Sequence, residues 1–245
     1  MSKFSTHTLV AYWGPREETA RECANRLAHM IDDLAALHPA FARWMNKAYT
    51  LEEAYSPFCK MPPVLDELTV KFEQNRHTYD DPRDPIRELG FSLAAWNGLN
   101  RPQGVSLSVQ AAAFVVTRPY PNHASMQFAP RGSGNEDLIA AANMESAMRI
   151  MVAAWQPVWM GLSSAAYGRH LTDYKGPTKH PWAGWMTYLS ESLAKKVTPP
   201  PSAIVERTPD GGMLLIATRE PFDDEDPAHL AAADAIQAAL KPVQR

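Results

Sequence analysis

Cysteine is scarce in this chain, with only Cys23 and Cys59 among 245 residues. Two cysteines are too few for the disulfide framework that holds many small exported domains together. Cys23 shares one face of a predicted helix with Leu27 and Met30, which indicates a small buried hydrophobe. Cys59 instead lies in a loop bounded by Pro57 and Pro62.

An excess of basic charge and a membrane-spanning run are also lacking. The formal net charge is −3, so no global basic field draws nucleic acid or an anionic membrane. The uncharged run 104–117 is too short and too polar to span a bilayer. The first fourteen residues have no apolar stretch typical of a signal peptide. We therefore expect a cytoplasmic protein with one domain over residues 1–245 and no direct contact with nucleic acid or membrane.

No familiar catalytic or metal-binding spacing occurs. The eight histidines never stand four residues apart, and none pairs with a cysteine at zinc spacing. The sequence therefore predicts no metal and no cofactor. One enzymatic alternative stays open, a hydrolase with Cys59 as its nucleophile. His77 would be the base, and Lys60 would lower the pKa of the thiol.

Apolar periodicity predicts an α+β fold in which a mixed or antiparallel sheet packs with two long helices and a C-terminal helix. The predicted helices span residues 17–38, 65–72, 135–156 and 227–240. Asn135 and Asp226 are the expected N-caps of the last two. The predicted strands span residues 8–13, 41–49, 88–96, 105–112, 125–129, 158–167, 203–207 and 213–218. The last two flank Thr-Pro-Asp-Gly-Gly, a hairpin signal.

Two strand–helix–strand units, residues 6–49 and 123–167, have the same layout. Each carries a Trp-Met pair after its helix, at Trp44-Met45 and Trp159-Met160. Two interpretations are open: an ancient internal duplication, or convergent use of one packing solution.

Two acidic clusters lie in loops that contain proline. The clusters comprise Asp80, Asp81, Asp84 and Glu88, and Asp223, Asp224, Glu225 and Asp226. In one interpretation they are solvated loops and a helix cap. In the other they form a negative surface that binds a basic partner.

The stretch PWAGWMTYLS, residues 181–190, contains a third Trp-Met pair and no charge. A strand that is apolar on both faces is usually internal to a sheet covered on both sides. We therefore predict that Trp185 belongs to the core. Trp182, beside Pro181 in a loop, is predicted to lie at the surface as part of an interface, where aromatic residues are enriched.

Within this stretch, Gly184-Trp185-Met186-Thr187-Tyr188-Leu189-Ser190 resembles the signature segment of the immunity protein 52 family. The chain length, the start with Tyr12-Trp13-Gly14 and the order of elements are similar as well. The resemblance implies a non-enzymatic antitoxin that binds one cognate toxin of a bacterial polymorphic toxin system. It further implies that the toxin is a nuclease of restriction-endonuclease fold, delivered by a contact-dependent, type VI-like secretion system.

The resemblance supplies no mapped binding residues. Our own prediction for the toxin contacts is the acidic loops and one tryptophan, namely Asp80, Asp81, Asp84, Asp223, Asp224, Glu225 and Trp182. The alternatives to an immunity protein are the Cys59 hydrolase and a structural adaptor that has no toxin.

Overall fold

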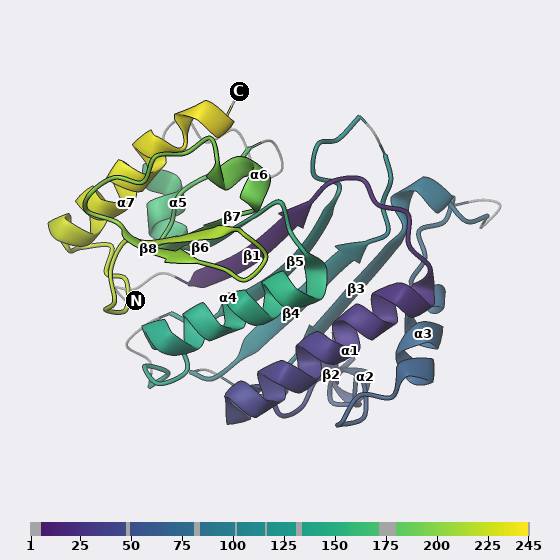
Figure 1. Ribbon diagram of the computed structural model, residues 1–245. Coiled ribbons are helices and arrows are strands. Elements are labelled where there is room, and N and C mark those ends of the chain that lie inside the picture. Colours follow the sequence, from purple (N-terminus) through teal and green to yellow (C-terminus); the bar gives the residue numbers. More distant parts are fainter. Residues whose placement is uncertain are drawn as a thin grey trace.

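The computed structural model describes residues 6–47, 50–80, 84–100, 102–115, 117–130, 134–171 and 180–244. One antiparallel sheet of nine strands, in the order β2-β3-β4-β5-β1-β6-β7-β9-β8, organises these residues (Figure 1). The strands are β1 His7–Trp13, β2 Met45–Asn46, β3 Phe91–Trp96, β4 Val105–Ala111, β5 Asn122–Phe128, β6 Trp159–Ser164, β7 Met186–Leu189, β8 Ile204–Arg207 and β9 Met213–Ile216. The predicted α+β class is therefore confirmed, with antiparallel pairing at every strand neighbour.

The helices lie between strands in the sequence, and the last one follows the final strand. They are α1 Ala20–Leu37, α2 Leu51–Ala54, α3 Leu65–Gln74, α4 Ala141–Trp155, α5 Ala165–His170, α6 Glu191–Ala194 and α7 Pro227–Ala239, with short 3-10 turns at Pro39–Phe41, Arg87–Leu89 and Lys241–Val243. No described helix is both long enough and apolar enough to cross a membrane.

The first long helix forms as its sequence predicts. Thr19 and Glu22 make a capping box: the Thr19 hydroxyl accepts from the Glu22 amide at 3.2 Å, and the Glu22 carboxylate accepts from the Thr19 amide at 2.7 Å. Both bonds satisfy donors that a helix leaves free at its start. The apolar face, including Cys23 and Leu27, is fully buried.

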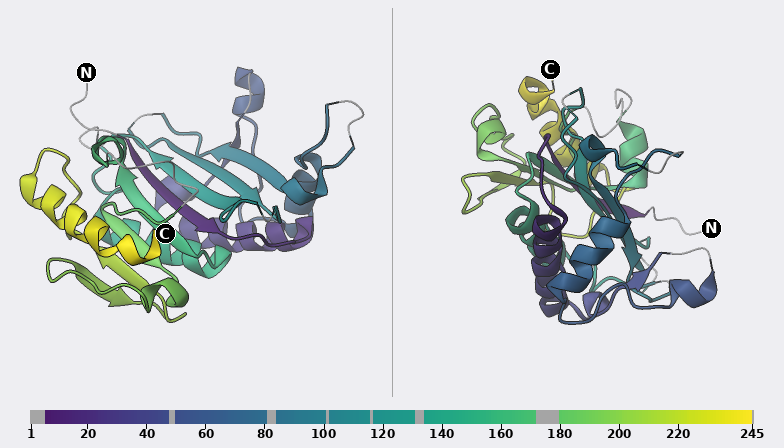
Figure 2. Two further views of the ribbon diagram at one scale, coloured as in Figure 1. Left: turned by 90° about the horizontal axis from the view of Figure 1, so that it is seen from above. Right: turned by 90° about the vertical axis from the view of Figure 1, so that its right-hand side faces the viewer.

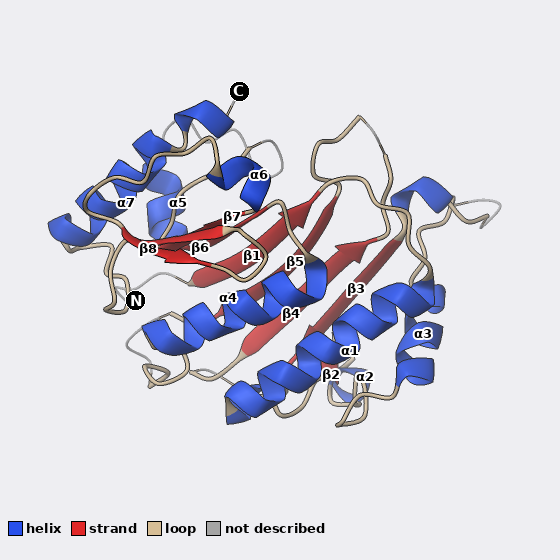
Figure 3. Cartoon of the chain, in the orientation of Figure 1, coloured by secondary structure: helices blue, strands red, loops and turns tan. Residues whose placement is uncertain are grey.

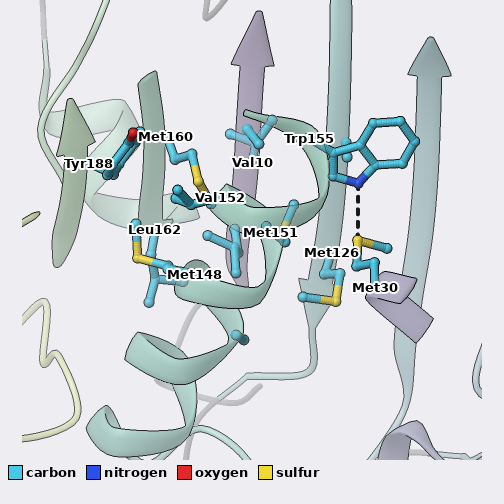
Figure 4. Packing of buried hydrophobic residues seen from close by; sticks show 14 of the residues in the cluster. Val10, Met30, Met126, Met148, Met151, Val152, Trp155, Met160, Leu162 and Tyr188 are labelled. Atoms are coloured by element: carbon cyan, nitrogen blue, oxygen red, sulfur yellow. Dashed lines mark hydrogen bonds between the residues drawn. The ribbon is translucent and has the colours of Figure 1, made fainter. Parts of the chain in front are cut away.

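Helices α1 and α4 lie side by side on one face of the sheet (Figures 2 and 3). Trp13 of β1 stacks on Trp155 of α4 with ring centroids 5.0 Å apart. The Trp155 indole N–H points at the sulfur of Met30 in α1, 3.1 Å away (Figure 4). Methionines fill the space between the two helices and the sheet, as a flexible and polarisable side chain can.

The opposite face of the sheet is covered only in part. In β3, β4 and β5 buried residues alternate with residues that are at least partly exposed, as expected when one face meets water. In β6, β7 and β9 every residue is buried. Helices α5 and α7 lie at that end of the sheet (Figure 1). Among the described residues, the uncovered face therefore extends over β3, β4 and β5, whereas in β1 only Thr8 on that side is partly exposed.

Four predicted boundaries are wrong, the first two because a local hydrogen-bond pattern replaces the regular one. Asn135 does not cap the second long helix, which begins at Ala141. The side chain of Asn135 is buried and donates to the Ala129 carbonyl at 3.1 Å. The predicted strand 158–167 ends at Ser164, because the Ser164 hydroxyl accepts from the Tyr167 amide and starts α5.

The predicted strand 41–49 shrinks to β2, preceded by the 3-10 turn Pro39–Phe41, and residues 48 and 49 lie outside the described residues. The predicted strand 88–96 likewise begins only at Phe91, after the 3-10 turn at Arg87–Leu89. The C-terminal elements match their predictions. Strands β8 and β9 form a hairpin, and the Asp226 carboxylate accepts from the Ala228 amide at 2.8 Å as the N-cap of α7.

The two strand–helix–strand units differ in how far apart their two strands lie in the sheet. Strands β1 and β2 of the first unit are separated by three strands, whereas β5 and β6 of the second flank β1. A duplication and convergent packing both stay predictions.

Candidate binding site

A pocket of about 320 Å³ opens where the uncovered sheet face meets α5. Its floor comes from alternate residues of β1 and β5, which point away from α1 and α4: Thr8, Val10, Tyr12, His123 and Ser125. Ser163, Gly168, Leu171 and Trp182 are among the residues that form its walls. Segments far apart in the chain therefore build one concave site.

Trp182 forms its wall by packing over a glycine. A Cβ atom at Gly161 would lie 2.8 Å from the Trp182 ring, so only glycine leaves room for it. Trp182 also meets Trp159 edge to face, with ring centroids 5.5 Å apart. Only 7% of Trp182 is exposed. The predicted surface position of Trp182 is therefore wrong, because Gly161 lets the indole sink into the sheet.

The polar side chains on the pocket floor are uncharged. The side chains of Thr8, His123 and Ser125 make no hydrogen bond to another described residue, although the His123 ring lies 6.1 Å from the Tyr12 ring. Burial lowers the pKa of His123, which keeps the imidazole neutral at neutral pH. Among the described residues that line the pocket, no side chain other than this histidine is acidic or basic. The pocket thus combines apolar walls with uncharged donors and acceptors.

Ser164 ties the pocket to the second acidic cluster. Its hydroxyl accepts from the Tyr167 amide at 3.0 Å and donates to the Asp224 carboxylate. The Asp223 carboxylate accepts from the Glu225 amide at 2.9 Å. Asp224 is partly exposed and also holds the hydroxyl that starts α5, so solvation describes only part of its surroundings. Glu225 is exposed.

The two acidic clusters do not come together. Asp80 and Asp84 are exposed ahead of β3, and Asp81 lies outside the described residues. The second cluster follows β9, six strand spacings from β3 in the sheet. At about 4.8 Å per spacing, these strands are about 29 Å apart. A partner would have to be large to contact both clusters at once.

The segment from Gly184 to Ser190 builds core. All four residues of β7 are buried, and the strand is internal, between β6 and β9. Trp185 is fully buried and donates its indole N–H to the Thr218 carbonyl at 2.9 Å. A Cβ atom at Gly184 would lie 2.2 Å from the Leu162 carbonyl oxygen, so the close approach requires glycine. The predicted core position of Trp185 is confirmed.

Tyr188 and Met186 of the same strand are buried too. The Tyr188 hydroxyl donates to the Asp210 carboxylate in the turn between β8 and β9. Burial, followed by this carboxylate, raises the pKa of Tyr188. The segment therefore joins the end of the sheet to the hairpin.

Cys59 is placed poorly for a nucleophile. Only 8% of Cys59 is exposed, and burial raises the pKa of its thiol to about 11. The expected lowering by Lys60 is wrong, because Lys60 pairs with the Glu67 carboxylate. The proposed base, His77, is engaged with the Gln110 amide oxygen at 3.0 Å. Among the described residues, no three His, Cys, Asp or Glu side chains gather as a metal site.

Sequence reasoning missed the pocket. Thr8, His123 and Ser125 are single polar residues at alternate positions of strands, which is also the pattern of any solvated sheet face. Only the pairing of β1 with β5 brings them together.

Comparison with known proteins places the whole chain in context. The model of a family described as immunity protein 52 matches residues 5–243. Among solved structures, the fold is similar to "Pseudomonas aeruginosa T6SS protein PA0821", with a TM-score of 0.59 and 11% sequence identity, over 100% of this chain and 75% of that one. No curated protein matched the chain.

Proposed function

Since this chain belongs to the immunity protein 52 family, we propose that it neutralises one cognate toxin by binding it tightly in a one-to-one complex in the cytoplasm. The observation that carries the proposal is the family match, which spans residues 5–243 and so nearly the whole chain. The toxin in this proposal is a nuclease of restriction-endonuclease fold. Its delivery by a type VI secretion system fits the printed name of the structural neighbour.

The chain acts here as a binding protein and supplies no catalytic step. The buried thiol of Cys59 and the engaged ring of His77 support this view. Two modes of inhibition fit the proposal. The chain covers the active-site cleft of the nuclease with carboxylates that stand in for nucleic-acid phosphates, or it binds elsewhere and blocks a toxin dimer or a change of conformation.

The first mode rests on exposed carboxylates in loops. Asp80, Asp84 and Glu225 are exposed, and no ion pair joins any of them to another described residue. Asp224 and Asp223 stay in the predicted contact set, although both also hold their own loop together. Exposed charges speed the encounter with an oppositely charged partner more than they stabilise the final complex.

The experiment uses the toxin encoded beside the gene of this chain, with its nuclease activity removed by mutation. Calorimetry measures the affinity, and stopped-flow measures the association rate at low and high ionic strength. The phosphate-mimic mode predicts a rate that falls steeply with salt. The triple variant Asp80→Asn, Asp84→Asn and Glu225→Gln should associate more slowly and depend less on salt.

The matched control is Asp66→Asn, which neutralises an exposed carboxylate outside the two clusters. It should leave the association rate unchanged. A flat salt dependence of the wild type excludes the phosphate-mimic mode and leaves the second mode. A neighbourhood without a toxin gene, or a neighbouring toxin that does not bind, would contradict the proposed function itself.

A further inference from the structure

The described strand residues of the uncovered sheet face and of the pocket floor carry no formal charge. The residues of β3, β4, β5 and β1 that point away from α1 and α4 are serine, threonine, alanine, glutamine, histidine, valine and aromatic residues. Acidic and basic residues together make up 21% of the whole chain. A solvated sheet face of ordinary composition would carry several of them. This face therefore suits a partner surface that is itself uncharged.

The pocket at the end of this face sets the chemistry of the group that fills it. A buried ion without a counter-charge is costly, and among the described lining residues none is acidic and the one basic group is the neutral His123. Trp182 and Val10 offer apolar walls, while Thr8 and Ser125 offer uncommitted hydroxyls. A group with an apolar ring and one neutral polar atom satisfies both kinds of surface.

Size points in the same direction. A volume of about 320 Å³ is at the lower end of the range of roughly 300–1,000 Å³ for ligand pockets. A cavity of about 150 Å³ already holds a benzene ring, so the pocket has room for one phenol or indole side chain. Tyrosine and tryptophan are the residues that most often anchor protein interfaces by filling a pocket on the partner.

We propose that the cognate toxin inserts an uncharged aromatic side chain, tyrosine or tryptophan, into the pocket between β1, β5 and α5. The toxin surface around this anchor then lies on the uncharged face of β4 and β5. This inference rests on the proposed function and names the docking surface for it. The anchor sets the lifetime of the complex, whereas the acidic loops set only the rate of encounter.

Gly168 allows a direct test. It lines the pocket from α5, and a Cβ atom added there meets no atom of another described residue within 4 Å. Gly168→Leu therefore adds a large side chain at the edge of the pocket without a clash with the described residues, and Gly168→Ala is the matched control that adds one methyl group. Both exchanges replace glycine within a helix, so neither should lower the melting temperature.

Calorimetry with the inactive toxin measures the effect. Gly168→Leu should raise the Kd by about 30-fold or more, which is the loss expected when an anchor residue is displaced. Gly168→Ala should stay close to the wild type. A Gly168→Leu protein that melts normally and binds the toxin like the wild type would overturn the inference and leave the proposed function standing. A wild type that does not bind the toxin would overturn both.

A labelling experiment tests whether the toxin fills the pocket even if the Gly168→Leu variant does not fold. Both native cysteines are buried, so the thiol in Gly168→Cys is the one exposed to a maleimide reagent. Excess toxin should slow its labelling at least tenfold. As the control, Asn25→Cys on the exposed side of α1, which lies on the opposite face of the sheet, should label at the same rate with and without toxin. Equal labelling of Gly168→Cys with and without bound toxin would show that the pocket stays empty.

Discussion

Replacing Trp185 by alanine would remove one of the largest fully buried side chains of the core. The indole donates to the Thr218 carbonyl at 2.9 Å and meets the His7 ring edge to face, with centroids 5.9 Å apart. Its strand neighbours are buried on both sides, so the surroundings have little freedom to close the space. The substitution should therefore destabilise the fold through a residual cavity.

The magnitude follows from similar core truncations, which cost about 3–5 kcal/mol for tryptophan or phenylalanine. Unfolding entropy is roughly 2.1 cal/mol/K per residue. For 245 residues it amounts to about 0.5 kcal/mol/K. Trp185→Ala should accordingly lower the melting temperature by about 6–10 °C.

Trp185→Phe separates the two parts of this loss. It keeps an aromatic ring but leaves the Thr218 carbonyl without its indole donor, which should cost about 1–3 kcal/mol. Differential scanning calorimetry of the wild type, Trp185→Phe and Trp185→Ala should show melting temperatures that fall in this order. Toxin affinity measured well below the melting temperature should be the same for all three. If Trp185→Ala melted like the wild type but no longer bound the toxin, the residue would be an interface anchor and its assignment to the core would be refuted.

Two further outcomes are expected. Asp226→Ala removes the bond to the Ala228 amide at the start of α7 and should cost about 1 kcal/mol in urea unfolding, whereas Asp226→Asn, which can still accept that bond, should cost less. His123 has a folded pKa below its ordinary value of 6.5, so its neutral form contributes stability above pH 6.5 that is lost as the pH falls through the folded pKa. Guanidinium unfolding should show the wild type losing more stability between pH 7 and pH 5 than His123→Gln, and identical losses would contradict the burial of the imidazole.

Local patterns in the sequence were enough for most elements of the fold. The apolar face of α1, the hairpin β8–β9 and the cap of α7 each depend on residues within a few positions of one another. The core position of Trp185 followed from a short segment that is apolar on both faces.

Long-range pairings decided what the sequence could not show. Trp182 is buried because Gly161, on a strand that precedes it by about twenty residues, has no side chain. Asp224 is held by Ser164 of β6, and nothing near Asp224 in the sequence indicates this bond. The pocket needs β1 beside both β5 and β6, which is a property of the assembled sheet.

The central position of β1 sets the time at which this protein can first act. In the sheet Trp13 pairs with Asn122 and His7 with Phe128, so both partners are more than a hundred residues further along the chain. At roughly 5–20 residues per second, a growing chain makes β5 about 5–25 seconds after β1. The strand that will lie at the centre of the sheet, and form the floor of the pocket, waits during that interval without its neighbours. On the proposed function, a newly made copy would offer no protection until synthesis had passed β6, and a cell under attack would depend on copies that were completed beforehand.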